Sequence, residues 1–144
     1  MTPRIIYLIK RAEIEVTARM SKVLETYDIT PAQFTLLYFI DTANGDLSSA
    51  QLSRRFSMTP QSMNELVQVL QRKKLLKKSV DPAHRRILRI SLTAKGKQLL
   101  ANCNTALDSM EEILLKDISP AEKDDVRNVI GKILAAAKKK KKRH

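Results

Sequence analysis

The stretch that decides the fold is residues 48–93, SSAQLSRRFSMTPQSMNELVQVLQRKKLLKKSVDPAHRRILRISLT. Ser48 and Gln51 have the spacing of a capping box, in which each side chain satisfies a backbone N–H. This predicts a helix over about Ser49–Phe56. Thr59 can cap a second helix whose first position holds a proline, where a missing N–H costs nothing. Two short capped helices in succession are typical of a helix-turn-helix.

The second helix has an apolar face and a polar face. Its apolar residues recur with helical periodicity, so we expect four of them to turn inward: Met63, Leu66, Val67 and Leu70. The residues that then face outward carry amide, hydroxyl or carboxylate groups: Gln61, Ser62, Asn64, Glu65 and Gln68. Asparagine and glutamine can pair bidentately with adenine in the major groove. The polar face is therefore a candidate reader of base edges.

A basic hairpin follows the second helix. The segments Leu75–Val80 and Ile87–Leu92 have strand character on either side of a basic tip, which is typical of the wing of a winged helix-turn-helix. Residues 72–97 contain ten Lys or Arg and a single acid, a net +9 in a chain whose formal charge is +12. The terminal run Lys138–Arg143 adds +6, so the other residues together carry −3. Charge concentrated in this way favours a phosphate-binding footprint, and a merely solvated face is the alternative.

Size and composition limit the remaining choices. A chain of 144 residues with 43% hydrophobic content can form one domain, or one compact unit with an appended dimerisation element. Three glycines, five prolines and long periodic segments indicate a mostly helical protein. The chain has neither an apolar run of membrane-spanning length nor a signal-peptide pattern, so we expect a cytoplasmic protein without membrane insertion. The single cysteine, Cys103, excludes an intramolecular disulfide and fits a reducing compartment.

Longer helices are predicted before and after the helix-turn-helix and wing. The apolar stripes of these helices are larger than the small core of the helix-turn-helix can bury. The helices run over about Arg4–Tyr27, Pro31–Ala43, Ala94–Asp117 after the cap Thr93, and Pro120–Ala137. The simplest partner for surplus stripes is an identical chain, and a two-fold homodimer suits a palindromic operator. We therefore expect helical dimerisation regions at 1–30 and 94–137, a winged helix-turn-helix DNA-binding region at 31–93, and a basic disordered tail at 138–144.

Three phrases of the sequence resemble the MarR (multiple antibiotic resistance regulator) family. They are Ser48-x-x-x-Leu52-Ser53, Asp81-Pro82-x-x-x-Arg86 and Leu92-Thr93-x-x-Gly96. The resemblance covers about residues 5–137. It implies a homodimeric transcription factor of mostly α structure with a small β-wing, whose DNA binding is often released by a small ligand or by cysteine oxidation. It also implies that the outward-facing residues of the second helix read bases and that Arg86 enters the minor groove, where narrow A·T-rich stretches concentrate negative potential.

The remaining expected DNA contacts lie around this helix. We expect wing contacts from His84, Arg85 and Arg86. Contacts to the DNA backbone are expected from Ser48, Arg54, Thr59 and Lys78.

The sequence departs from the family pattern at three positions. His84 stands where many members have an aspartate that orients the wing arginine, so that orientation must come from elsewhere, with Asp81 as a candidate. Lys74 replaces the glycine that usually ends the recognition helix, and a lysine in a left-handed conformation would cost roughly 1 kcal/mol. Glu65 puts an acid on the reading face, where it can accept from cytosine N4 or repel phosphate.

Other chemistry-bearing residues have a structural interpretation. Cys103 lies on an apolar stripe, so we expect a core thiol and not a redox sensor. His84 can be either a solvated residue or a groove contact. The methionines at 20, 58, 63 and 110 are expected to fill the core, although an adaptable ligand cavity is the alternative. The lysine run can contact flanking DNA, RNA or anionic lipid, or be an ordinary tail.

No catalytic constellation, metal-ligand spacing or cofactor motif appears, so an enzyme is not expected. The leading hypothesis is a homodimeric, sequence-specific DNA-binding regulator that represses transcription and is released by a small ligand or another signal. The alternative is a non-regulatory winged-helix module that binds nucleic acid without sequence preference or contacts other proteins.

Overall fold

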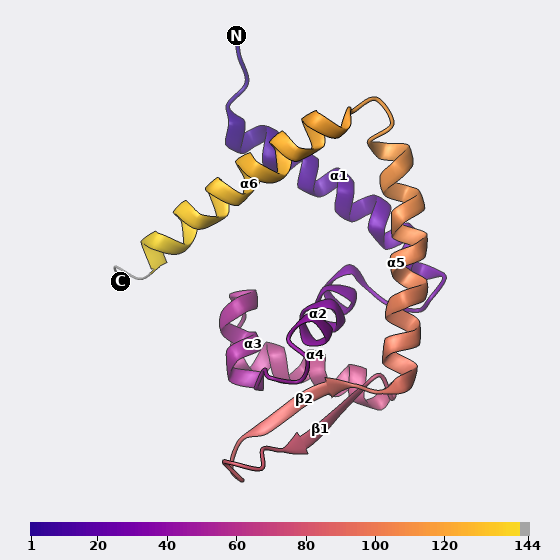
Figure 1. Ribbon diagram of the computed structural model, residues 1–144, viewed down its shortest axis with the longest axis vertical. Coiled ribbons are helices and arrows are strands. Elements are labelled where there is room, and N and C mark those ends of the chain that lie inside the picture. Colours follow the sequence, from indigo (N-terminus) through magenta and orange to yellow (C-terminus); the bar gives the residue numbers. More distant parts are fainter. Residues whose placement is uncertain (142–144) are drawn as a thin grey trace. The chain divides into compact units, whose positions relative to one another are not determined.

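The computed structural model describes residues 1–141 (Figure 1). The order of elements is α1 (Ile5–Glu25), α2 (Pro31–Thr42), α3 (Ser49–Phe56), α4 (Pro60–Arg72), β1 (Leu76–Val80), β2 (Leu88–Leu92), α5 (Ala94–Leu114) and α6 (Pro120–Lys141). A mostly helical fold with a small two-stranded wing is thus confirmed. Internal contacts divide the chain into two units, Met1–Met110 and a second unit that begins at Glu111.

The predicted helix starts are confirmed by their capping contacts. At α2, Gln33 N donates to Thr30 Oγ1 and Thr30 N donates to Gln33 Oε1, both at 3.1 Å. The same reciprocal pair begins α3 between Ser48 and Gln51, while at α4 Thr59 accepts from the backbone of the third helical residue. These contacts join residues three positions apart, and the sequence alone therefore predicts them.

One hydrophobic core joins α2, α3 and α4 to the sheet. Met63, Val67 and Leu70 on the inner face of α4 are completely buried, and Leu66 is partly buried, as their spacing predicted. Met20 and Met58 also pack against this core, which supports the core-filling interpretation of the methionines. Cys103 of α5 is completely buried, and burial raises the pKa of its thiol, so the core-thiol interpretation is confirmed.

The wing is an antiparallel hairpin whose base is tied to the core. The register pairs Leu76 with Leu92 at the base and Val80 with Leu88 near the tip. Ile90 is completely buried, and its N–H donates to the carbonyl of Leu47 in the segment between α2 and α3 at 3.3 Å. The base of the hairpin is thus fixed to the helices, while its tip extends from them (Figure 1).

The helix α4 ends in a left-handed turn at Lys74, whose φ is +63°. Lys74 N donates to Gln71 O and Leu75 N donates to Leu70 O, both at 2.9 Å, which is the hydrogen-bond pattern of a Schellman motif. The expectation that a lysine occupies a position suited to glycine is therefore confirmed.

Gly96 lets α5 begin directly against this turn. Thr93 caps α5 by accepting from Gly96 N at 3.0 Å, and it also donates through Oγ1 to Lys74 O at 2.7 Å and through N to Leu75 O at 3.0 Å. A Cβ on Gly96 would lie 2.2 Å from Leu75 O. Only glycine therefore permits this approach between the start of α5 and the end of α4.

The terminal helices keep large apolar side chains exposed within each unit. On α1 these are Ile5, Ile6, Tyr7, Leu8, Ile9 and Ile14, and on α6 they are Val126, Val129, Ile130, Ile133 and Leu134. Neither α1 nor α6, nor any other helix in residues 1–141, is both long and apolar enough to cross a membrane. The boundaries expected for the dimerisation and DNA-binding regions stay a prediction.

The C-terminal boundary differs from the expected one. The helix α6 continues to Lys141, so residues 138–141 are helical and their assignment to a disordered tail was wrong. Alanine and lysine are both strong helix formers, and a run of three alanines followed by lysines therefore extends a helix that has already begun. Residues 142–144, also assigned to that tail, lie outside the described part.

Candidate nucleic-acid interface

The outward face of α4 presents the five residues that the sequence predicted. Gln61, Ser62, Asn64, Glu65 and Gln68 are all exposed. Among residues 1–141, Gln61, Glu65 and Gln68 have no side-chain hydrogen bond or ion pair, so these groups are available to an external partner. Their contacts with bases stay a prediction.

The cap of α4 orients one of these residues. Thr59 accepts from Ser62 N at 3.1 Å and donates from its hydroxyl to Ser62 Oγ at 3.0 Å. The Ser62 hydroxyl is thereby held at the N-terminal end of α4, where helix N–H groups and the helix dipole favour a phosphate.

Asn64 is oriented by a residue that the sequence analysis missed. Ser49, the first residue of α3, donates from Oγ to Asn64 Oδ1 at 2.8 Å. The two residues are fifteen positions apart and belong to different helices, so no short-range pattern indicates the contact. Packing of α3 on α4 brings them together.

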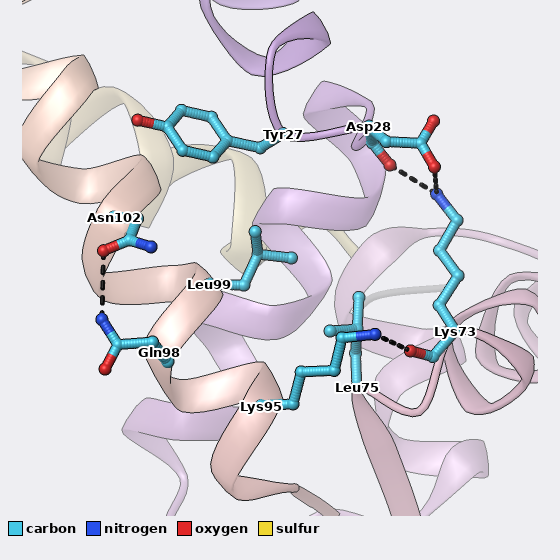
Figure 2. Close-up of a pocket in the computed structure, with 8 residues that line it drawn as sticks. All are labelled: Tyr27, Asp28, Lys73, Leu75, Lys95, Gln98, Leu99 and Asn102. Carbon is cyan, nitrogen blue, oxygen red and sulfur yellow. Dashed lines mark hydrogen bonds and ion pairs between the residues drawn. The ribbon is translucent and has the colours of Figure 1, made fainter.

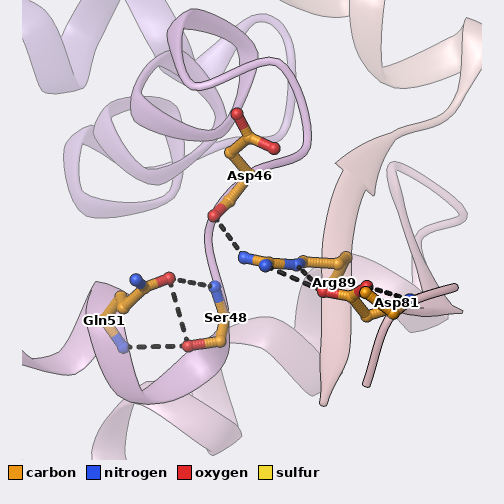
Figure 3. Close-up of polar contacts among 6 residues, drawn as sticks. Asp46, Ser48, Gln51, Asp81 and Arg89 are labelled. Atoms are coloured by element: carbon orange, nitrogen blue, oxygen red, sulfur yellow. Dashed lines mark hydrogen bonds and ion pairs between the residues drawn. The ribbon is translucent and has the colours of Figure 1, made fainter. Parts of the chain in front are cut away.

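Arg89 on β2 links the wing loop, through Asp81, to the segment between α2 and α3, through Asp46 (Figure 3), and we call this set of contacts the arginine clamp. Arg89 donates through Nε and Nη2 to Asp81 Oδ2, at 3.0 and 2.8 Å, and through Nη1 to the carbonyl of Asp46. Asp81 Oδ1 accepts from Ala83 N at 2.8 Å. Asp81 is buried, and these hydrogen bonds, that of Ala83 first and those of Arg89 next, lower the pKa of its carboxyl. It therefore stays ionised, and the clamp joins both ends of the wing loop to the segment before α3.

This clamp corrects one expectation. Asp81 was the candidate for orienting Arg86, but it binds Arg89 instead, and both of its oxygens are occupied. In residues 1–141 the side chains of His84, Arg85 and Arg86 are exposed and have no hydrogen-bond or ion-pair partner. His84 is therefore solvated in the free chain, and its contact with a groove stays a prediction, as do those of the two arginines.

The residues expected to contact the DNA backbone lie in different environments. Ser48 is half-buried and its hydroxyl is engaged with Gln51 at the start of α3. Arg54 and Thr59 are exposed, and Lys78 is exposed on β1 opposite Ile90. Their roles toward DNA stay predictions.

A pocket of about 480 Å³ lies at the C-terminal end of α4 (Figure 2). Its lining residues come from the segment after α1, the residue that follows α4, the residue before β1 and the first turns of α5: Tyr27, Asp28, Lys73, Leu75, Lys95, Gln98, Leu99 and Asn102. Lys73 Nζ donates to the carbonyl of Asp28 and lies 3.5 Å from its carboxylate, while Lys95 Nζ donates to Lys73 O at 3.2 Å. The sequence analysis missed this pocket because its walls are distant in sequence.

The pocket thus combines the apolar side chains of Leu75 and Leu99 with two lysines, Lys73 and Lys95, whose contacts hold the end of α4. Among residues 1–141, no three His, Cys, Asp or Glu side chains form a group that could hold a metal ion.

Comparisons with known proteins agree with this geometry. The model of the MarR family matches residues 27–87. The chain is 25% identical over 136 residues to the uncharacterized HTH-type transcriptional regulator YhbI of Bacillus subtilis, covering 94% of this chain and 84% of YhbI. It is 24% identical over 127 residues to the HTH-type transcriptional repressor Rv2887 of Mycobacterium tuberculosis, covering 88% of this chain and 91% of the repressor.

A solved structure of similar shape is the complex of Staphylococcus aureus MepR with DNA. It has a TM-score of 0.79 and 25% identity, and the match covers 93% of this chain and 96% of MepR. The segment matched by the family model contains α2, α3, α4 and most of the wing, and the likeness to MepR extends through the flanking helices. Residues 27–87 of the chain thus match the MarR family of transcriptional regulators, and the likeness to MepR shows a winged helix-turn-helix fold over 93% of the chain.

Proposed function

We propose that this protein binds a palindromic operator in double-stranded DNA as a homodimer and represses transcription from it. The observation that carries the proposal is the exposed amide and hydroxyl face of α4 together with a wing tip whose arginines have no side-chain partner among residues 1–141. An arginine without an intramolecular partner keeps all of its donors for phosphate or a groove. The DNA complex of MepR and the repressor title of Rv2887 support the same function.

The proposal divides the contacts by their chemistry. Gln61, Asn64 and Gln68 read base edges in the major groove, and Arg86 enters the minor groove. Ser48, Arg54, Thr59 and Lys78, together with the basic block around the wing, contact phosphates and fix the register. The absence of an enzymatic role and a location in the cytoplasm, where the DNA lies, are part of the same proposal.

Homodimerisation is proposed from the exposed side chains of the terminal helices. Ile5 is 68% exposed, Ile113 is 70% exposed and Leu134 is 58% exposed, and Ile5 and Leu134 have further exposed apolar residues beside them on their helices. Contiguous apolar patches of this kind mark interaction sites in soluble proteins. Sedimentation at micromolar concentration should give a dimer, and a stable monomer would exclude this part of the proposal.

A small ligand is proposed to release the DNA through the pocket at the end of α4. A ligand there would compete for the ammonium group of Lys73, which links the last turn of the recognition helix to Asp28. It would also touch Leu75, the residue that enters the wing. A compound that shifts the DNA-binding curve should lose its effect in Leu99→Trp, which fills the pocket without changing a residue of the DNA-binding face.

The experiment that tests the central proposal is selection of DNA from a random pool by the purified full-length protein. The selected sequence should be palindromic and preferred over random duplex by about 10³-fold or more. Affinity should also fall steeply with salt, because several phosphates per protomer are neutralised. Binding without sequence preference that is abolished by deletion of Lys138–His144 would replace the regulator with the architectural module.

A further inference from the structure

The contact between Ser49 and Asn64 bears on which base the recognition helix prefers. Asn64 lies one turn into α4, on the face proposed to read DNA, and the following inference rests on that proposal. Ser49 donates to its side-chain carbonyl at 2.8 Å. We propose that Ser49 makes Asn64 a hydrogen-bond donor toward DNA, so that Asn64 selects guanine or thymine, which offer only acceptors to it in the major groove, over adenine, whose N6 group is a donor.

The Ser49 hydroxyl is free for this task because another residue caps its helix. Ser48 accepts from Gln51 N at 3.3 Å, and Gln51 in turn accepts from Ser48 N at 2.9 Å. Ser49 is the next residue, at the first helical position, and its hydroxyl has no role in this cap. Among residues 1–141, the Ser49 hydroxyl bonds to the side chain of Asn64 alone.

The helix dipole fixes which end of the amide faces Ser49. The N-terminus of a helix carries a partial positive charge from backbone N–H groups without partners. The first turn of α3 contains no acidic side chain that would offset this charge. An amide that lies there is stabilised with its carbonyl oxygen toward the helix end and its NH₂ group away from it. The orientation in which Ser49 donates to Asn64 Oδ1 therefore agrees with the local electrostatics.

This orientation changes what Asn64 can read. Recognition of adenine by asparagine uses both ends of the amide, since the carbonyl accepts from N6 and the NH₂ group donates to N7. In Asn64 one of the two lone pairs of the carbonyl oxygen already accepts from Ser49, which holds that oxygen toward α3, while the NH₂ group keeps two donors. Guanine offers two acceptors in the major groove, N7 and O6, and thymine offers O4. Both bases match a side chain that presents donors alone.

The test measures base preference one base pair at a time. The operator selected by the wild-type protein is varied singly at every position, and competition binding is measured for wild type, Ser49→Ala, Asn64→Ala and the double variant. Asn64→Ala identifies the base pair that Asn64 reads, and duplexes changed on one strand at a time identify which base of that pair is read. There the wild type should prefer guanine or thymine, and Ser49→Ala should move the preference toward adenine by about tenfold. Ser49→Ala should have no such effect when Asn64 is already alanine.

Two further variants separate orientation from other roles of Ser49. Ser49→Thr keeps the hydroxyl and should retain the wild-type preference. Ser21→Ala, at an exposed serine of α1, is the matched control and should change nothing. Melting curves of all variants exclude unfolding as the cause of a change.

Each contrary outcome has a distinct meaning. A loss of affinity that is equal for every sequence in Ser49→Ala would show a phosphate contact and overturn the inference. A wild-type preference for adenine or cytosine at the Asn64 position, or no change in Ser49→Ala, would overturn it as well. In these cases the DNA-binding function would stand. Failure of the wild type to prefer any sequence would instead refute the proposed function and the inference together.

Discussion

Replacing Gly96 with alanine should destabilise the protein, although alanine is the better helix former. Gly96 is the third residue of α5, and its added Cβ would meet Leu75 O at 2.2 Å, whereas ordinary contact begins at 3.4 Å. The start of α5 and the turn after α4 would have to separate by about 1 Å to relieve this overlap, taking 3.4 Å as the limit.

The expected loss can be worked out from the contacts at this junction. Separation would break the two hydrogen bonds from Thr93 to the carbonyls of Lys74 and Leu75, each of which contributes about 1 kcal/mol. Overpacking typically adds about 1–3 kcal/mol, and the helix propensity of alanine returns up to about 1 kcal/mol. We therefore expect the free energy of unfolding to fall by about 2–4 kcal/mol and Tm to fall on the order of 10 °C.

The matched control is Gly131→Ala in the middle of α6. Apart from its chain neighbours and the backbone of α6 itself, a Cβ at Gly131 would meet no atom of residues 1–141 within 4 Å, so within one protomer the helix propensity term acts alone and should raise stability by up to about 1 kcal/mol. Both variants are measured by chemical and thermal denaturation at one protein concentration, because a dimer's stability depends on it. A Gly96→Ala protein as stable as the wild type would refute the close approach of α5 to Leu75.

Three further predictions concern the turn and the wing. Lys74→Gly should raise the free energy of unfolding by about 1 kcal/mol in chemical denaturation, because φ at this position is +63°, and Lys74→Ala, which keeps a Cβ, should give no such gain. The pKa of Asp81 is lowered in the folded chain, so its carboxylate stabilises the fold above the ordinary value of 3.8, and this contribution is lost as the pH falls through the lower folded value. Asp81→Asn should therefore reduce the loss of stability in acid measured by pH-dependent unfolding, and an unchanged acid limb would contradict the clamp. Arg86→Ala should weaken binding most for operators with A·T-rich flanks in a competition titration, and equal weakening on G·C-rich flanks would argue against a minor-groove contact.

Local chemistry explains why much of the fold follows from the sequence. The starts of α2, α3 and α4 depend on caps whose partners lie three residues apart, and the buried face of α4 depends on periodicity alone. The left-handed turn at Lys74 was implied by the resemblance to the family, in which a glycine usually ends this helix at the same place. The end of α6 was missed because the lysine run was interpreted by its charge, while its helix propensity determined its structure.

Contacts that orient the candidate site could not be predicted in the same way. Ser49 reaches Asn64 across fifteen positions, and Arg89 reaches the carbonyl of Asp46 across 43. Each pair depends on the packing of whole elements, which periodicity does not specify. The sequence therefore predicted which groups face outward, while the packing determines the direction in which they point.

The two ends of α4 are held by different kinds of contact. Base recognition therefore depends on contacts at one end of the helix, and release by a ligand depends on contacts at the other end. At the N-terminal end, Thr59 and Ser49 act on side chains of the reading face, Ser62 and Asn64, so changes there alter which sequence is bound. At the C-terminal end, Lys73 is held by Asp28 at the rim of the pocket, and no residue of the reading face takes part. A ligand at that end would shift the whole helix and weaken binding to every operator by the same factor. Effector compounds should thus lower affinity without changing base preference.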